Sequence, residues 1–240
     1  MSRRGTIPGT GRTTILLARH GQIVQQPTGP DGSRRYVGNI DIPLDEAGRA
    51  QGREMARVLA GLPVAVAVSS DLGRSVETAE LALAGLPVAP ELRREPALRE
   101  ICIGDWQGMY PAEVRRQYPG AWEARGADLA GYRPPGGENF TDVADRALPA
   151  LIAVARDLHA TGDAQQDRTA LVVAHAGVNL AILCRLMDLP LASALAMPQD
   201  YCGLNVLVWN EEWQHLAVRT VNLLPPALGP NWARAYDVIG

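Results

Sequence analysis

Three short runs of consecutive apolar residues divide the chain into similar units: residues 15–18, 64–68 and 171–174. Short apolar runs of this kind are typical of strands buried on both faces of a parallel sheet, although periodicity alone does not distinguish them from buried helical segments. Polar residues follow each run at once: Arg19-His20-Gly21, Ser69-Ser70 and His175-Ala176-Gly177. We therefore expect three core strands, each of which delivers polar side chains where it ends.

Helical patterns follow the first two runs. After Asp45, a candidate N-cap, apolar residues recur at the i, i+3, i+4 and i+7 positions of an amphipathic helix: Met55, Val58, Leu59 and Leu62. Asp71 is the candidate N-cap of a second helix that runs to about Leu83. The chain thus passes twice from strand through loop to helix.

The second half of the chain continues the alternation. Residues 140–158 keep one apolar face, which predicts a helix with a kink at Pro149. An almost wholly apolar helix is expected over 178–187, and two β-rich segments, 204–209 and 216–221, complete the sheet. Alternating strands and helices predict an α/β fold, a three-layer α/β/α sandwich with a mostly parallel central sheet.

We expect one domain, residues 13–224, between a flexible N-terminal tail (1–12) and a C-terminal extension (225–240). Two segments interrupt the regular pattern. Residues 22–44 form a long loop rich in Gly, Pro and Asp, and long loops in compact domains are usually functional. Residues 103–138 interleave Trp and Tyr with Arg and resemble an insertion over one end of the sheet, which we interpret as a packed subdomain rather than a recognition surface.

Composition narrows the partners and the compartment. The 240 residues carry a net charge of -3, so there is no basic field to hold nucleic acid or an anionic membrane. No stretch approaches the length of a membrane span. The 3 cysteines, an odd number without metal-type spacing, favour a reducing compartment over a disulfide framework. We expect a cytoplasmic protein without nucleic-acid or membrane partners.

Cationic side chains gather at the predicted strand ends. Ligands of mostly parallel sheets bind beyond the carboxyl ends of the strands, where Arg19, His20 and His175 follow their strands directly. Arg74 is expected near the third position of its helix, where the helix dipole disfavours a cation unless an anion such as phosphate compensates. Glu77 either orients Arg74 or forms an ordinary surface pair with it. The pattern predicts a phosphate pocket.

His20 is the natural nucleophile in such a pocket, because an imidazole with a pKa of about 6.5 is largely neutral at pH 7 and carries a lone pair. Glu100 would donate a proton to the leaving oxygen and then activate water, if its segment folds over the pocket. Fixed cations supply the charge that phosphoryl transfer needs, so no cofactor or metal is expected. Taken singly, each of these side chains is more often structural, and their joint placement favours function.

Four motifs occur in order along the chain: Leu17-Ala18-Arg19-His20-Gly21, Ser69-Ser70-Asp71-Leu72-Gly73-Arg74-Ser75-Val76-Glu77-Thr78-Ala79, Leu98-Arg99-Glu100-Ile101 with Gly104-Asp105-Trp106-Gln107-Gly108, and Val173-Ala174-His175-Ala176-Gly177. Together they resemble the histidine phosphatase superfamily, the phosphoglycerate mutase-like proteins. The resemblance implies the corresponding three-layer fold and a metal-independent phosphomonoesterase in which His20 is phosphorylated. It also implies that Arg19, Arg74 and His175 hold the phosphate and that Glu100 is the proton donor.

The chain departs from the family pattern at residues 22–26, Gln-Ile-Val-Gln-Gln, where many members carry an Asn that touches the phosphate. That contact is not carried over. The compact segment 135–139 resembles the phosphatase branch, so we expect hydrolysis of a small phosphorylated metabolite, with α-ribazole phosphate among the candidates. A phosphoglycerate mutase-type transfer and a non-catalytic phospho-ligand binding protein stay open as alternatives, as does a homodimer.

Overall fold

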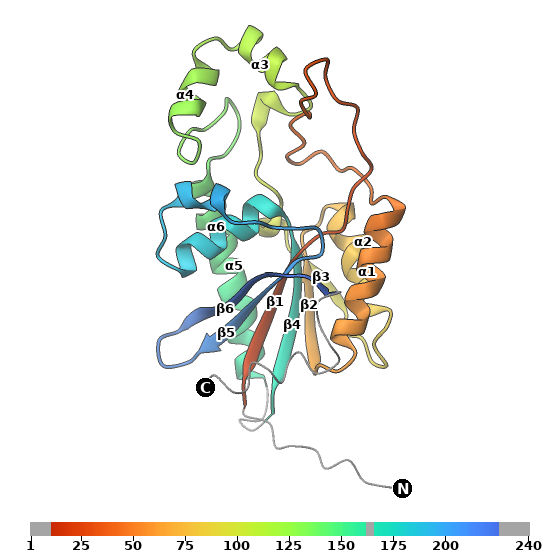
Figure 1. The fold of residues 1–240 in the computed structure, drawn as a ribbon. Helices are drawn as coiled ribbons and strands as arrows, with labels where there is room; N and C mark the ends of the chain where they lie inside the picture. Colours follow the sequence, from red (N-terminus) through yellow and green to blue (C-terminus); the bar gives the residue numbers. More distant parts are fainter. Residues whose placement is uncertain (1–10, 162–165, 226–240) are drawn as a thin grey trace, which may run out of the picture.

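Six strands form one sheet within residues 11–161 and 166–225, the part of the chain that this computed structural model describes (Figure 1). The strand order across the sheet is β3-β2-β4-β1-β5-β6. The first four strands of this order pair in parallel, whereas β5 pairs antiparallel with both of its neighbours, β1 and β6. The mostly parallel sheet is thereby confirmed, although the sequence did not predict β3. The strands are β1 (Thr13–Arg19), β2 (Val64–Ser69), β3 (Leu92–Arg94), β4 (Arg168–Ala174), β5 (Leu204–Asn210) and β6 (His215–Leu223).

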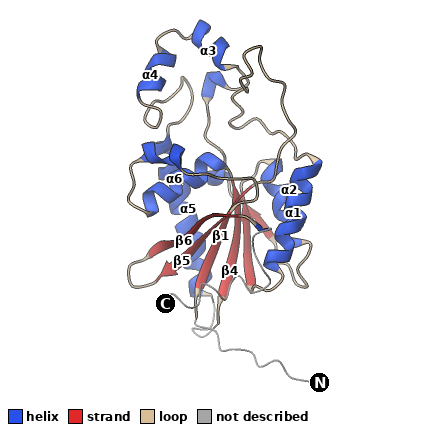
Figure 2. Cartoon of the chain, viewed as in Figure 1, coloured by secondary structure: helices blue, strands red, loops and turns tan. Residues whose placement is uncertain are grey.

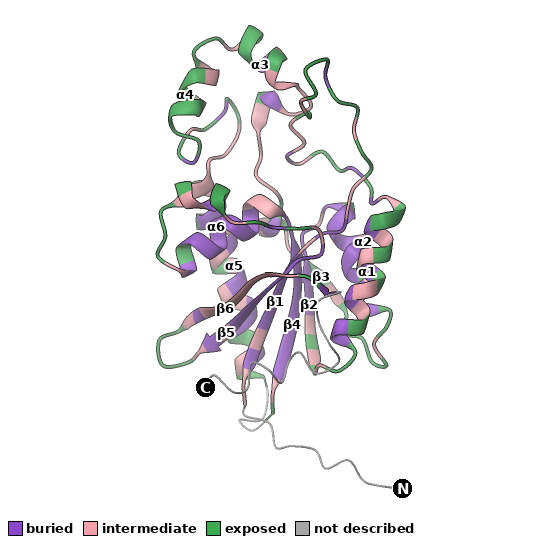
Figure 3. Ribbon diagram, viewed as in Figure 1, coloured by how far each residue is buried: buried purple, intermediate pink, exposed green. Residues whose placement is uncertain are grey.

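Helices cover both faces of the sheet and complete the predicted three-layer sandwich (Figure 2). Successive residues of β1 point to opposite layers: Ile15 and Leu17 pack with α5 and α6, whereas Leu16 and Ala18 pack with α1 and α2. Both faces of the central strands are therefore buried (Figure 3), which is why β1 reads as a continuous apolar run. The four helices are α1 (Glu46–Leu59), α2 (Gly73–Leu83), α5 (Phe140–Ala160) and α6 (Ala176–Leu186).

One of the two predicted N-caps is wrong. Asp45 caps α1 as expected, since its Oδ1 accepts a hydrogen bond from the Gly48 N–H at 2.7 Å. Asp71 does not cap α2, because Leu72 is the N-cap residue and makes no side-chain cap bond. The Asp71 carboxylate instead accepts hydrogen bonds from Nε and Nη2 of Arg99. The local sequence pattern favoured a cap because it does not show that Arg99, which is distant in sequence, binds this carboxylate.

The later elements lie close to their predicted positions. The helix expected over residues 140–158 is α5, which extends to Ala160 and continues through Pro149. The apolar helix expected over 178–187 is α6. No helix among the described residues is long and apolar enough to cross a membrane. The predicted terminal segments lie almost wholly outside the described residues.

The 103–138 insertion is a small aromatic subdomain above the sheet edge (Figure 1). Trp106 is fully buried, and its ring is surrounded by the rings of Tyr36, Tyr118 and Tyr132. Tyr36 belongs to the 22–44 loop, so the insertion and the loop share one apolar centre. The helices of the 103–138 insertion are the short 3-10 helix at Gly104–Trp106, α3 (Pro111–Gln117) and α4 (Ala121–Ala127).

Close backbone packing fixes the chain just after β1. A Cβ atom on Gly48 of α1 would lie 2.0 Å from the carbonyl oxygen of Gln22, and one on Gly21 would lie 2.6 Å from the carbonyl oxygen of Gly48. Glycine at both positions lets the loop cross α1 in contact with its backbone. His20 therefore stands between a buried strand and a firmly packed turn.

Candidate active site

The ends of β1, β2 and β4 meet at one edge of the sheet. In the observed register Arg19 of β1 lies opposite Ala174 of β4, and Ser69 of β2 lies opposite Val173. His20 and His175 are consequently level with each other, and Ser70 lies one residue before them, beside Ala174. The expectation that separate strand ends bring the two histidines together is confirmed, since their ring centroids are 5.1 Å apart in an edge-to-face arrangement.

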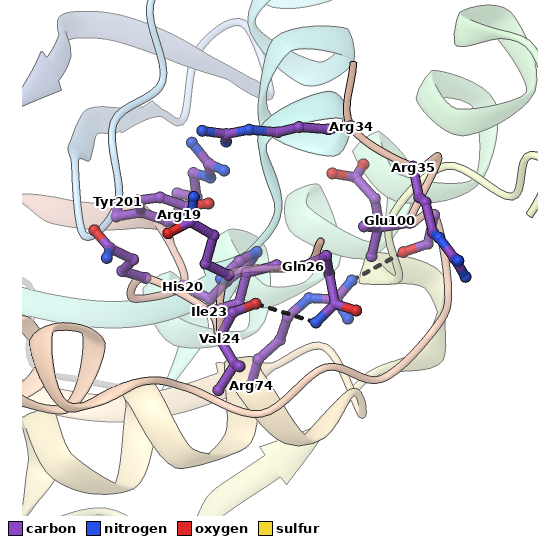
Figure 4. A pocket seen from close by; sticks show the side chains of 14 residues that line it. Arg19, His20, Ile23, Val24, Gln26, Arg34, Arg35, Arg74, Glu100 and Tyr201 are labelled. Atoms are coloured by element: carbon purple, nitrogen blue, oxygen red, sulfur yellow. Dashed lines mark hydrogen bonds between the residues drawn. The ribbon is translucent and has the colours of Figure 1, made fainter. Parts of the chain in front are cut away.

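A pocket of about 340 Å³ opens above this edge (Figure 4). Arg19, His20, Arg74 and Glu100, which the sequence singled out, all line it, whereas His175 is fully buried beside His20 and does not. The 103–138 insertion contributes no lining residue, in keeping with a packed subdomain. The remaining lining residues come from the 22–44 loop and from the segment before β5: Gln22, Ile23, Val24, Gln25, Gln26, Arg34, Arg35, Val37, Gly38 and Tyr201.

The backbone fixes the tautomer of His20. Its Nδ1 lies 2.7 Å from the carbonyl oxygen of Gly21, which only accepts hydrogen bonds, so Nδ1 carries the proton and Nε2 keeps the lone pair. Burial and the nearby charge of Arg74 lower the pKa of His20 from 6.5 to about 3. The ring is therefore a neutral base across the physiological range, with Nε2 free to act as a nucleophile.

His175 is held by hydroxyl groups. Its Nε2 lies 2.8 Å from the Ser70 Oγ and 3.3 Å from the Ser75 Oγ. Ser75 is placed to donate to the Ala174 carbonyl, and the Ser70 hydroxyl accepts from the Leu72 N–H. We assign the Ser70 proton to the hydrogen bond with Nε2, which leaves Nδ1 of His175 as an N–H donor. Burial, followed by the repulsion between the two rings if both were protonated, lowers the pKa of His175 well below 6.5, so this donor is neutral.

Arg19 and Arg74 are positioned by backbone carbonyls. Nη1 of Arg19 donates to the Gln199 carbonyl at 2.6 Å. Arg74 is 2 % exposed and donates to the carbonyls of Ile40 at 2.7 Å and Gly38 at 3.0 Å. These bonds orient the guanidinium groups without neutralising their charge.

Three buried N–H donors at the site have no hydrogen-bond partner among the described residues: Arg19 Nε, Arg74 Nε and His175 Nδ1. Buried donors are rarely left unsatisfied in folded proteins, and doing so costs about 1–3 kcal/mol each. The three come from three different strand ends or helix starts around His20. An anion that accepts all of them, as a phosphate does, would satisfy the site.

Glu100 reaches the pocket from the segment after the 3-10 helix at Pro96–Leu98. Its Oε1 accepts from the Ile101 N–H at 2.9 Å, and its Oε2 accepts from the Gly177 N–H at 3.2 Å. Gly177 lies in the first turn of α6, directly after His175 and Ala176. The carboxyl group is thus fixed to the same strand end that carries His175, on the pocket side, as the sequence predicted if its segment folded over the site.

One of the two predictions around Arg74 is wrong. Arg74 lies near the predicted third position, as the second residue of α2. Glu77 neither orients Arg74 nor pairs with it, because it binds the Nε of Arg49 on α1 at 2.7 Å. Asp41 of the 22–44 loop also lies near Arg74: its Oδ1 is 3.8 Å from Nη1, and its Oδ2 accepts a hydrogen bond from the Gly73 N–H at 2.8 Å.

Sequence reasoning missed Tyr201 and Gln199, which lie in the segment before β5. The Tyr201 ring stacks under the Arg19 guanidinium, 3.8 Å from the ring centroid, and lies 5.8 Å from the His20 ring. Gln199 is buried in a network with Asn179 and Asn205, which fixes the carbonyl that holds Arg19. No signal in the sequence marked these two residues. They lie at the site because β5 is antiparallel to β1, and an antiparallel strand begins at the edge where its parallel neighbours end.

The fold and the pocket together define an α/β enzyme site for a phosphate group. The model of the histidine phosphatase superfamily (branch 1) matches residues 15–222, and the chain belongs to this superfamily. It is a phosphatase, an enzyme that hydrolyses phosphomonoesters.

Named relatives and a solved structure agree with this assignment. The chain is 39% identical to a glucosyl-3-phosphoglycerate phosphatase of Mycolicibacterium vanbaalenii, over 73% of this chain and 75% of the relative. It is 34% identical to a metal-independent phosphoserine phosphatase of Arabidopsis thaliana, over 76% and 72%. The native structure of a mycobacterial glucosyl-3-phosphoglycerate phosphatase superimposes with a TM-score of 0.72 at 32% identity, covering 88% of this chain and 98% of that one.

The two buried histidines predict how stability depends on pH. Their folded-state pKa values lie below 6.5, so between about pH 6.5 and pH 3 the unfolded chain binds more protons than the folded protein. The free energy of unfolding should therefore fall as the pH falls, by up to about 1.4 kcal/mol per pH unit for each histidine.

Thermal melts at about pH 7 and about pH 5 measure this slope above the range where most carboxylates titrate. The His20→Gln variant should lose roughly half of the dependence. A slope that is the same in the variant and the parent would show that His20 is protonated in the folded protein at mildly acidic pH.

Proposed function

We propose that this phosphatase works without a metal, through a phosphohistidine formed on Nε2 of His20, and releases phosphate from a small phosphorylated metabolite. One observation carries the proposal: a neutral imidazole with a defined lone pair lies at the same edge of the sheet as three buried N–H donors that lack partners among the described residues. A pure binding site needs the donors but has no use for the nucleophile or for Glu100.

In the first step Nε2 of His20 attacks phosphorus, and the ester P–O bond breaks. Negative charge spreads over the three non-bridging oxygens, where Arg19, Arg74 and His175 Nδ1 donate hydrogen bonds. Because these donors are fixed before the reaction, they stabilise the charge without reorganising. Glu100, in its protonated form, gives its proton to the leaving alkoxide.

In the second step the Glu100 carboxylate takes a proton from water, and the water oxygen attacks the phosphohistidine. The P–N bond breaks, Nε2 of His20 recovers its lone pair, and inorganic phosphate leaves. Glu100 ends the cycle protonated, as it began. One carboxyl group thus serves first as acid and then as base, which the hydrogen bonds from Ile101 and Gly177 allow by holding it in one place.

The substrate class is supported by the pocket and by the relatives. A pocket of about 340 Å³ is in the range of small-molecule sites rather than of protein-docking surfaces. The relatives' names specify glucosyl-3-phosphoglycerate and phosphoserine as their substrates. A cytoplasmic location and a homodimer stay predictions.

Release of inorganic phosphate from p-nitrophenyl phosphate and from a panel of metabolite phosphates tests the proposal. We expect turnover that is unchanged by an excess of chelator, because the transition-state charge is met by the protein's own donors. Rapid exchange between 2- and 3-phosphoglycerate without phosphate release would instead identify a mutase, and loss of turnover on chelation would contradict the metal-independent mechanism.

A further inference from the structure

The pocket holds more positive charge than one phosphate group requires. Its lining contains the four arginines Arg19, Arg34, Arg35 and Arg74 and a single carboxyl group, Glu100, which is protonated when it acts as the acid. Arg19 and Arg74 belong with the phosphate. Arg34 and Arg35 come from the 22–44 loop and take no part in the chemistry described above.

The two loop arginines differ in their surroundings. The Arg35 guanidinium lies 4.6 Å from the centroid of the Tyr110 ring, and its contact with the phenol oxygen raises its pKa. Arg35 therefore anchors the loop to the insertion. Arg34 forms no hydrogen bond, ion pair or ring contact with the described residues, and Figure 4 shows its side chain extended across the pocket from the loop. Its charge is available to a ligand.

The backbone on the C-terminal side of Arg34 is held in place. Tyr36 exchanges two hydrogen bonds with the insertion, donating to the Met109 carbonyl at 3.0 Å and accepting from the Gly108 N–H at 2.7 Å. Gly38, at a φ of 51°, accepts from Arg74, and a Cβ there would lie 2.9 Å from the Gln107 Oε1. These contacts fix the loop to both the phosphate site and the insertion.

The start of the loop is tied to the same subdomain. The Tyr110 hydroxyl donates to the Pro27 carbonyl at 3.2 Å, and the turn that precedes Arg34 is closed by a hydrogen bond from the Gly29 N–H to the Ser33 carbonyl at 2.9 Å. Arg34 thus projects from a loop held at several points, so its reach over the pocket is set by the fold.

We propose that Arg34 binds a carboxylate on the part of the substrate that is not transferred, so that the preferred substrates are phosphomonoesters of hydroxy acids. The proposal rests on the proposed function of the pocket. Arg19 and Arg74 donate to the phosphate, and Arg34, which has no partner among the described residues, is left to face the part of the substrate that is not transferred. The planar guanidinium suits a carboxylate, which it can bind through two parallel hydrogen bonds.

Matched substrate pairs test the proposal. In the first pair, 3-phosphoglycerate has a carboxylate where glycerol 3-phosphate has a hydroxymethyl group. In the second pair, phosphoserine has a carboxylate where phosphoethanolamine has a hydrogen atom. We expect kcat/KM to be about tenfold higher for the acid of each pair. This factor corresponds to the weakest hydrogen bonds that charged groups form in proteins, and we choose it because Arg34 is exposed to solvent. Arg34→Gln should abolish the preference by raising KM for the acids, with kcat unchanged, because the contact is the same in the ground and transition states.

Arg93→Gln is the matched control, since it removes the same charge from an exposed position on β3 that does not line the pocket. It should leave the preference intact. Equal kcat/KM within each pair for the parent enzyme would overturn the proposal, as would an Arg34→Gln variant that lowers kcat for all four substrates, which would mean that Arg34 acts on Glu100. Absence of phosphate release from p-nitrophenyl phosphate as well would instead refute the proposed function.

Discussion

We expect His20→Ala to lose at least about 10⁴-fold in kcat for every phosphomonoester, because removal of a nucleophile leaves only binding and charge stabilisation to act on the substrate. The variant should stay folded. Within the described part of the chain, the one hydrogen bond of the His20 side chain is local, to the carbonyl of the next residue, and the surrounding strands are held by their own backbone hydrogen bonds. Phosphate-release assays together with circular dichroism separate lost chemistry from lost structure.

A labelling experiment distinguishes the nucleophile from a merely positioning histidine. Brief reaction with labelled substrate followed by alkaline quench should trap one phosphoryl group on the parent protein and none on His20→Ala. His215→Ala is the control, because His215 starts β6 and does not line the pocket. Label that persists in His20→Ala would move the covalent step to another residue and would refute the mechanism.

The sequence predicted the central strands and the residues that follow them, for a physical reason. Strands buried on both faces are apolar throughout, so Arg19, His20 and His175 mark where the apolar runs end. Parallel pairing brings these strand ends to one edge of the sheet. The sequence alone therefore predicted that Arg19, His20 and His175 lie at the same edge of the sheet. The register that places Arg19 opposite Ala174 was not predicted and comes from the structure.

What the sequence did not predict depends on contacts between distant segments. Tyr201 enters the site because β5 runs antiparallel, and a β-rich segment carries no mark of its direction. Asp71 has the local features of an N-cap, but Arg99 competes for it, and Glu77 is taken by Arg49 from another helix. Polar partners of this kind are chosen by tertiary packing, which local patterns do not encode.

The sequence also did not predict a role for Arg34. This residue lies in a loop of more than twenty residues without a regular hydrophobic pattern, so the path of the loop could not be predicted. Its course is set by the Tyr36 and Tyr110 contacts with the insertion. The aromatic insertion thus serves the site indirectly. It shares its apolar centre with the loop and so holds the loop against the pocket, without lining the pocket itself.

Arg74→Lys is expected to reduce kcat/KM by roughly 10²–10³-fold, the range found when one preorganised donor to a transition-state oxyanion is removed. Lysine keeps the charge but lacks the guanidinium fork. Arg74 uses Nη1 and Nη2 on the Ile40 and Gly38 carbonyls while its Nε–H stays available, and a single ammonium group cannot hold the loop and meet the phosphate in the same geometry.

Arg49→Lys provides the control, because Arg49 pairs with Glu77 between α1 and α2 outside the pocket and should tolerate the change with less than about a threefold effect. The affinity for inorganic phosphate, measured by calorimetry, should fall in Arg74→Lys alone. If Arg74→Lys kept full activity, a positive charge would suffice at that position and the oriented N–H groups of the guanidinium would not be needed. The Nε–H of Arg74 would then make no contribution to catalysis. The mechanism then would rest on Arg19 and His175, the two remaining sources of directed N–H groups around His20.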